Sequence, residues 1–186
     1  MSAFIPCSNI PLQSETVPAI KILHFNGHPR ADEVYAYARI YACDGLLHYC
    51  FMRFEEEPAD TVRFGFALAN ADKTGEFVLL NIGFKGYASL GYYKNNKLCE
   101  ELSLQKPRLF TSGDEQGLYN GAEGVIALDV LKAYLKREFA PGEVFVGNFF
   151  SYDTSEAAFG CAFAVPLGES IPTTAGFEPL LCISFD

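Results

Sequence analysis

The sequence predicts an all-β protein, an antiparallel sandwich or barrel with one short helix. Two observations carry this prediction. The aromatic residues, 15% of 186, are all Phe or Tyr, and together with many Val, Ile and Thr they favour strands. Turn signals also recur about every ten residues, as in sandwiches built from short strands. The length suits a single domain over residues 1–186, with residues 1–25 as a strap leading into a sandwich over 26–186.

The clearest element is a hairpin over residues 34–54, where apolar residues alternate with other side chains. Asp44-Gly45 is a strong signal for a two-residue hairpin turn. That turn would pair Arg39 with Cys50 and Tyr37 with Met52. One face, predicted as core, holds Ala38, Ile40, Leu47, Tyr49 and Phe51. The other face, predicted to be half-covered or to bind a ligand, holds Tyr35, Tyr37, Arg39, Tyr41, His48, Cys50 and Met52.

The remaining elements follow from turn residues and periodicity. We expect a helix near 129–138, because Asp129 is a favoured N-cap, an apolar stripe follows it, and Pro141-Gly142 comes after it. The Gly-rich stretch 113–124 is predicted to be a long loop. Further strands are predicted over 61–69, 76–84, 87–93, 98–104, 123–128, 144–151, 157–165 and 180–185.

Charge and cysteine content exclude several function classes. Lys and Arg number 14 against 23 Asp and Glu, which argues against nucleic acid and against an anionic membrane surface as partners. No apolar run is long enough to span a bilayer, and residues 1–7 do not resemble a signal peptide, so we expect a cytoplasmic protein with six free thiols. No metal-ligand spacing and no nucleophile or phosphate-binding motif stands out, so no catalytic residue is predicted.

Several short motifs, in order, resemble the family 9-like carbohydrate-binding modules. The first is Arg39-Ile40-Tyr41 followed by Asp44-Gly45-Leu46-Leu47-His48-Tyr49-Cys50-Phe51. The second is Ile126-Ala127-Leu128 before a helix, then Pro141-Gly142-Glu143-Val144 and Gly147-Asn148-Phe149-Phe150. The third is the tail from Gly176-Phe177-Glu178-Pro179 to Phe185. The resemblance covers about residues 32–186.

This resemblance implies a jelly-roll β-sandwich that binds saccharides through aromatic rings, in some members with structural calcium. The candidate ligand-binding residues are Tyr37, Arg39 and His48 on the hairpin face, the loop rings Tyr92 and Tyr119, and Asn148 and Tyr152, which lie where the resemblance places a functional loop. A calcium ion could be held by Glu55-Glu56-Glu57 with Asp60, although such a run is also typical of a solvated strand end. No other cofactor is expected.

Our leading hypothesis is therefore non-catalytic saccharide binding through a Tyr/Arg face. Family members that bind sugar rely on Trp, and this chain has none. A second hypothesis is a structural or protein-interaction sandwich that has lost sugar binding and buries the Tyr stripe, for instance in a homodimer. A third is a sandwich-fold glycoside hydrolase or lyase using paired carboxylates such as Glu100-Glu101 or Asp114-Glu115.

Overall fold

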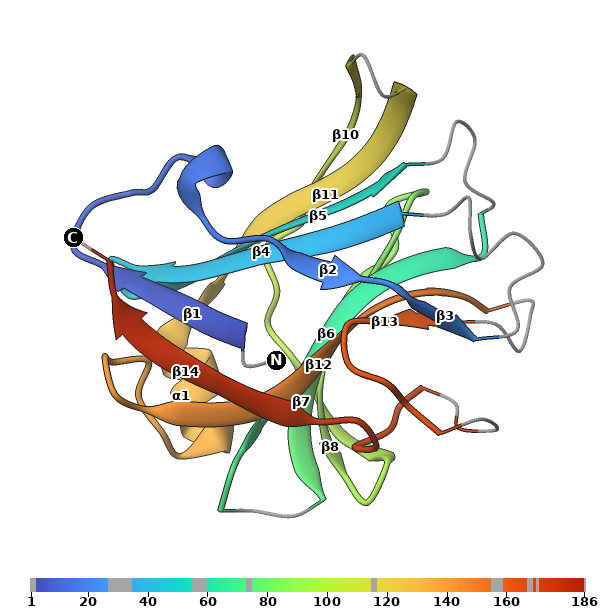
Figure 1. Ribbon diagram of the computed structural model, residues 1–186. Coiled ribbons are helices and arrows are strands. Elements are labelled where there is room, and N and C mark those ends of the chain that lie inside the picture. The colour runs from blue at the N-terminus through green and yellow to red at the C-terminus, as the bar shows by residue number, and fades with distance from the viewer. Residues whose placement is uncertain are drawn as a thin grey trace.

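The computed structural model describes residues 3–26, 35–54, 60–72, 75–114, 117–154, 159–166, 169 and 171–185. Its strands form two layers, which Figure 1 shows one above the other. The first layer runs in the order β10 (Arg108–Asp114), β11 (Gly117–Ala127), β5 (Leu46–Phe54) and β4 (Tyr35–Cys43). The second runs β14 (Glu178–Ser184), β12 (Val144–Asp153), β6 (Val62–Asn70), β7 (Glu76–Gly83), β8 (Ala88–Lys94) and β9 (Lys97–Leu102).

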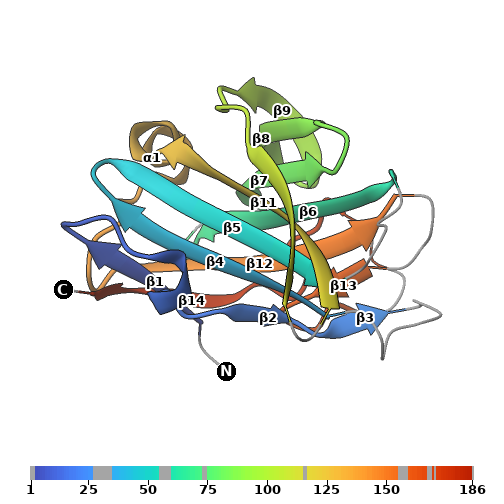
Figure 2. The ribbon, with the colours of Figure 1, turned by 90° about the horizontal axis from the view of Figure 1, so that it is seen from above.

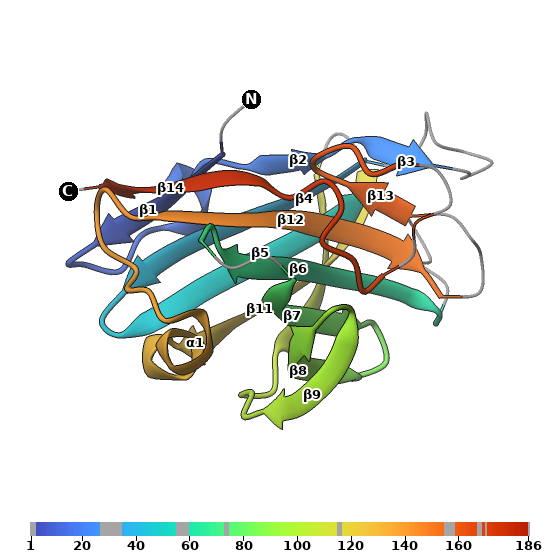
Figure 3. The same ribbon diagram turned by 90° about the horizontal axis from the view of Figure 1, so that it is seen from below.

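The two layers are joined along one side by the N-terminal strand β1 (Ala3–Ser8). It lies between β4 and β14 and is parallel to both. Short strands complete this side: β2 (Ile20–Ile22) pairs with β4, and β3 (His24–Asn26) pairs with β13 (Phe159–Cys161), which itself pairs with β12. The views from above and below show β1, β2 and β3 following one another along this side (Figures 2 and 3).

The core fills the space between the layers. Its largest side chains are rings from both layers, among them Phe51, Phe66 and Phe149, each fully buried. A smaller cluster, including Phe77, Phe150 and Cys161, lies on the outer face of the second layer, where residues from the 159–177 segment cover it. The strands β6 and β7 of the second layer are therefore buried on both faces, and the first layer keeps one face half-exposed.

The predicted sandwich and its hairpin are confirmed. Arg39 pairs with Cys50 and Tyr37 with Met52, and all five predicted core residues of the hairpin are buried. The turn residues Asp44 and Gly45 both have positive φ, +48° and +72°, as a type I′ turn requires. All six cysteines are free thiols, as predicted.

The prediction of a loop over 113–124 was wrong. β10 and β11 form an antiparallel hairpin there, in which Arg108 lies opposite Glu123. The glycines serve close packing within the strand: a Cβ at Gly121 would lie 2.3 Å from the Phe110 ring, and one at Gly124 would lie 2.4 Å from the Tyr49 hydroxyl. Glycine in a strand often marks such a close approach, and composition alone does not separate this from a loop.

Two other predictions needed correction near the strap and β13. Residues 1–25 are expected to form a strap leading into the sandwich, but β1 is itself a full member of the sheet. The strap is the segment between β1 and β2, which contains the short 3-10 helix η1 (Ser14–Thr16). The strand expected over 157–165 is limited to Phe159–Cys161 among the described residues.

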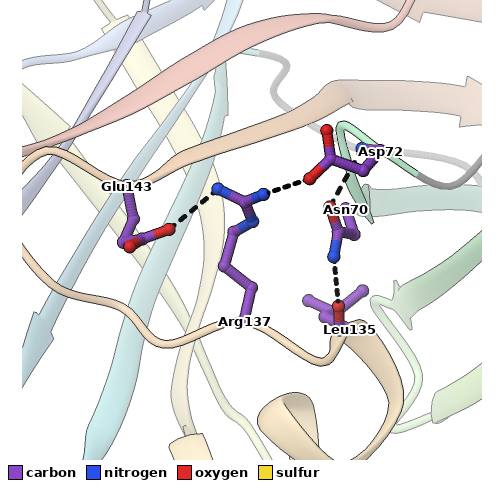
Figure 4. A network of polar contacts seen from close by, with 5 residues as sticks. All are labelled: Asn70, Asp72, Leu135, Arg137 and Glu143. Atoms are coloured by element: carbon purple, nitrogen blue, oxygen red, sulfur yellow. Dashed lines mark hydrogen bonds and ion pairs between the residues drawn. The ribbon is translucent and has the colours of Figure 1, made fainter.

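The helix α1 spans Leu128–Leu135 and is shorter than the predicted 129–138. It packs Leu131 and Leu135 into the core and ends because Lys136 adopts a left-handed conformation with φ +55°. Figure 4 shows how this end is held: the Asn70 amide donates to the Leu135 carbonyl at 2.9 Å, and Arg137 bridges Asp72 and Glu143. No helix in the described ranges is long and apolar enough to cross a membrane.

The buried amide of Asn70 gives a first prediction. Asn70→Ala removes the partner of the Leu135 carbonyl, and we expect the free energy of unfolding to fall by about 1–2 kcal/mol because a buried backbone acceptor loses its donor. Asp72→Ala, which removes only an exposed ion pair with Arg137, should cost less than about 0.5 kcal/mol. Urea unfolding followed by circular dichroism measures both, and equal effects would contradict the assignment.

Candidate functional site

The half-exposed face of the first layer carries a pocket of about 360 Å³. The strap between β1 and β2 rises above β4 on the side where β10 and β11 also lie (Figure 1). The pocket walls come from β4, β5, β10, β11, the strap and the residues before β10. Its lining residues are Leu12, Ser14, Val17, Arg39, Tyr41, His48, Tyr49, Cys50, Gln105, Lys106, Arg108, Glu123, Gly124 and Val125.

The floor of the pocket follows from strand register. Tyr41 and His48 are direct partners across the β4–β5 hairpin, and their rings stack at 4.4 Å between centroids with planes 7° apart. Arg39 lies opposite Cys50, and Cys50 lies opposite Glu123 on β11. Successive residues on one strand alternate between faces, so these outward side chains gather on one surface.

The strap closes one side of the pocket through specific contacts. The Tyr41 hydroxyl donates to the Leu12 carbonyl at 3.4 Å, and Ser14 is hydrogen-bonded to the Cys50 thiol. Val17 is buried, which anchors the end of the strap just before β2. The strap is thus attached to the sheet on both sides of the pocket.

The ionisable groups of the pocket differ in whether they carry a charge near neutral pH. Arg108 and Glu123 form an ion pair, with Nε and Nη2 of the guanidinium at 2.8 and 2.7 Å from Oε1. Burial is the main cause that raises the pKa of the Cys50 thiol, and Glu123 adds to it. Burial also lowers the pKa of His48 against the opposing effect of Asp44. Near neutral pH the thiol and the imidazole are therefore both uncharged.

The lowered pKa of His48 predicts a pH dependence of stability. As the pH falls below the ordinary value of 6.5, the unfolded chain takes up a proton at His48 before the folded protein does. The stabilisation is complete above that value and is lost as the pH falls towards the folded pKa. We expect the melting temperature of the wild type to fall more between pH 7 and pH 5 than that of His48→Phe, which keeps the stacked ring. Parallel curves for the two proteins would contradict this.

Two of the predicted ligand residues, Arg39 and His48, line the pocket. Tyr37 and Tyr119 lie beside it on the same face: both rings pack against Phe54, with centroids at 6.5 and 5.3 Å, and the Tyr37 hydroxyl donates to the Met52 sulfur. The structure thus brings four predicted residues onto one surface. Tyr119 reaches this surface from β11, not from the loop that the sequence suggested.

The other three predicted residues lie elsewhere. Tyr92 packs against Tyr134 of α1 at 5.0 Å between ring centroids. Tyr152 is on the outer face of the second layer, where its hydroxyl donates to the Asn81 side chain at 2.7 Å. Asn148 has no exposed surface, and its amide bonds to backbone atoms of Phe149, Phe163 and Gly176. The fold thus buries Asn148 and uses its amide for backbone hydrogen bonds, and the ligand contact expected of it stays a prediction.

Sequence reasoning missed Lys106, Arg108 and Glu123, because it placed a loop over 113–124 and assigned no element to 105–108. A signal was present. Arg108 and Glu123 are equally spaced from the paired residues Asp114 and Gly117, so an antiparallel pairing of the two segments brings opposite charges face to face.

The proposed calcium residues Glu55-Glu56-Glu57 lie outside the described residues. Asp60, the fourth member of that set, pairs with Lys85. Within the described ranges, no three His, Cys, Asp or Glu side chains form a cluster that could hold a metal ion.

The likeness of this chain to known proteins lies in its fold. No family model matches the sequence, and no curated protein matches it significantly. Solved structures do match. A protein from Bacteroides uniformis ATCC 8492 that has been proposed to bind carbohydrate superposes with a TM-score of 0.65 at 14% identity, covering 97% of this chain and 99% of that one.

Two further structures are a family 9 carbohydrate-binding module from Caldicellulosiruptor kristjanssonii in complex with glucose and in complex with cellotriose. Both have a TM-score of 0.61 and 10% identity and cover 98% of this chain, with 96% and 94% of the module covered. This chain has the fold of the family 9 modules. The resemblance seen in the sequence is confirmed at the level of the fold, over nearly the whole length of both chains.

Proposed function

We propose that this protein binds a saccharide, without catalysis, in the pocket between the strap and the outer face of β4, β5 and β11. The observation that carries the proposal is the pocket itself, in which the stacked Tyr41–His48 pair and the Arg39 guanidinium lie side by side on adjacent strands. A sugar ring can pack its C–H groups against the aromatic pair, and its hydroxyls can accept hydrogen bonds from the planar guanidinium. The fold shared with modules solved with glucose and cellotriose supports the same class of ligand.

The ionisation of the pocket favours binding over hydrolysis. Glycoside hydrolysis needs two carboxyl groups flanking the scissile bond. Among the described residues that line the pocket, Glu123 is the one carboxylate, and it is paired with Arg108. The Cys50 thiol is kept protonated by burial, which does not favour a nucleophilic role.

The proposal is tested by calorimetric titration and thermal shift with glucose, cellotriose and a panel of other mono- and oligosaccharides, with and without calcium. A ligand at a hundred times its Kd should stabilise the protein by about 2.7 kcal/mol. We expect Tyr41→Ala to weaken binding at least tenfold. Tyr87→Ala, which removes an exposed ring on the second layer, should leave binding unchanged. No shift with any saccharide at millimolar concentration, or equal losses in the two variants, would overturn the proposal.

A further inference from the structure

The pocket has a charge opposite to that of the whole protein. The chain has a formal net charge of −9. The described residues of the pocket lining, in contrast, hold three cationic side chains, Arg39, Lys106 and Arg108, and one carboxylate, Glu123. The remaining ionisable groups of the lining, His48, Cys50 and two tyrosines, are uncharged near neutral pH. The exposed Glu15 lies on the strap beside the lining residue Ser14 and is not itself part of the lining.

Arg39 is the half-buried cation of the pocket, and no described carboxylate balances its charge. Its guanidinium carbon lies 4.9 Å from the centre of the Tyr37 ring, a stacking contact that fixes the plane of the group. Its Nε is buried and has no hydrogen-bond partner, and none of the described carboxylates forms an ion pair with it. Arg108, at the other side of the pocket, already has Glu123 as its partner.

A half-buried guanidinium that is held in place and lacks an anion is suited to an anionic ligand. Burial removes N–H donors of the guanidinium from water, which costs free energy. A carboxylate can offset this cost because its two oxygens accept parallel hydrogen bonds from two N–H groups of the guanidinium. Lys106, on the segment before β10, can add a second, longer-range attraction. The volume of about 360 Å³ is near the lower end of ligand sites, which span about 300–1,000 Å³, and suits one or two sugar units.

We infer that the ligand of this pocket is an acidic saccharide whose carboxylate, as in a hexuronate, is bound by Arg39. The inference rests on the proposed function, since the same pocket and the Tyr41–His48 pair would hold the sugar ring. Ser14 and Gln105, a hydroxyl and an amide in the lining, would face the sugar hydroxyls. An acidic sugar would thus use both the aromatic pair and the unbalanced cation.

The test is calorimetric titration of the full chain at low ionic strength with glucuronate, galacturonate, glucose, glucose 6-phosphate and acetate. We expect at least one hexuronate to bind tenfold or more tighter than glucose, and its affinity to fall as salt is added. Arg39→Gln should remove this preference, and Arg39→Lys, which keeps the charge but not the fork, should retain part of it. Arg63→Gln, which removes an arginine stacked on Tyr87 in the second layer, is the matched control and should change nothing.

The outcomes separate this inference from the proposed function. Equal affinity for hexuronates and glucose, both reduced by Tyr41→Ala, would overturn the acidic-ligand inference and leave saccharide binding standing. Tighter binding of glucose 6-phosphate than of either hexuronate would overturn the carboxylate assignment. Acetate binding as tightly as a hexuronate would show that the sugar contributes nothing, and the absence of binding by every saccharide would remove both proposals. The melting temperatures of the Arg39 variants are measured as a control. Values equal to that of the wild type exclude unfolding as the cause of a loss of binding.

Discussion

Phe66→Ala is expected to lower the free energy of unfolding by about 3–5 kcal/mol, the range for truncating a buried aromatic ring. Phe66 has no exposed surface and lies at the meeting point of the layers, with its ring centroid 6.1–6.3 Å from those of Tyr49, Phe51 and Phe149. The variant would remove contacts to both layers and leave a cavity that the stiff strands cannot close. For a chain of this length the melting temperature should fall by roughly 6–20 °C.

Two further variants make this result specific. Phe66→Leu keeps most of the buried volume and should cost about 1–1.5 kcal/mol. Ile10→Ala truncates an apolar side chain that is 65% exposed and should stay within about 0.5 kcal/mol of the wild type. Denaturant unfolding at constant pH measures all three. A loss below 1.5 kcal/mol for Phe66→Ala would show that the two layers are not packed as described.

Asn148→Ala should be the most damaging polar substitution, with an expected loss of about 2–4 kcal/mol. The Asn148 amide donates to the carbonyls of Phe163 and Gly176, at 2.8 and 3.1 Å, and accepts from the Phe163 N–H at 3.0 Å. Alanine would leave these backbone groups without their partner, and each unsatisfied buried group costs about 1–3 kcal/mol. The segment that covers the outer face of the second layer would lose part of its attachment to β12 and keep the β13–β12 pairing. Amide exchange at Phe163 should therefore accelerate.

This substitution also separates two roles for Asn148. Gln13→Ala, which removes an exposed amide, is the control and should leave stability unchanged. If Asn148→Ala keeps the stability and amide protection of the wild type but no longer binds saccharide, Asn148 is a ligand residue and the structural role is wrong. The loss of stability that we expect would place it in the framework of the fold.

The residues that were predictable from the sequence are those whose position depends on local chemistry. Asp44-Gly45 selects a tight turn, and the turn determines which side chains of β4 and β5 face outward. The hairpin turn by itself therefore puts Arg39 and His48 on one surface, as the structure has them. Two members of the same pocket, Arg108 and Glu123, were not placed, because the packing of Gly121 and Gly124 against neighbouring rings cannot be distinguished in sequence from a flexible loop.

Long-range contacts explain the other differences. The helix ends at Leu135, where Lys136 turns left-handed and Asn70, distant in sequence, donates to the last carbonyl. In the sequence, Lys136 and Arg137 resemble a continuing helical turn. Asn148 has the composition and setting of a ligand residue, and only the nearby backbone of Phe163 and Gly176 shows that its hydrogen bonds are already made. In both cases an amide bonds to the backbone of a segment far along the chain.

The sequence by itself determined the all-β class, the register of the β4–β5 hairpin and the outward face that carries Tyr37, Arg39, Tyr41 and His48, because these depend on strand alternation and one turn. Only the tertiary structure decided that β1 joins the two layers, that the strap and β10–β11 turn this face into a pocket, and that the buried Nε of Arg39 has no hydrogen-bond partner there. Such features depend on which distant segments pack together, and a local pattern of side chains does not specify these long-range contacts.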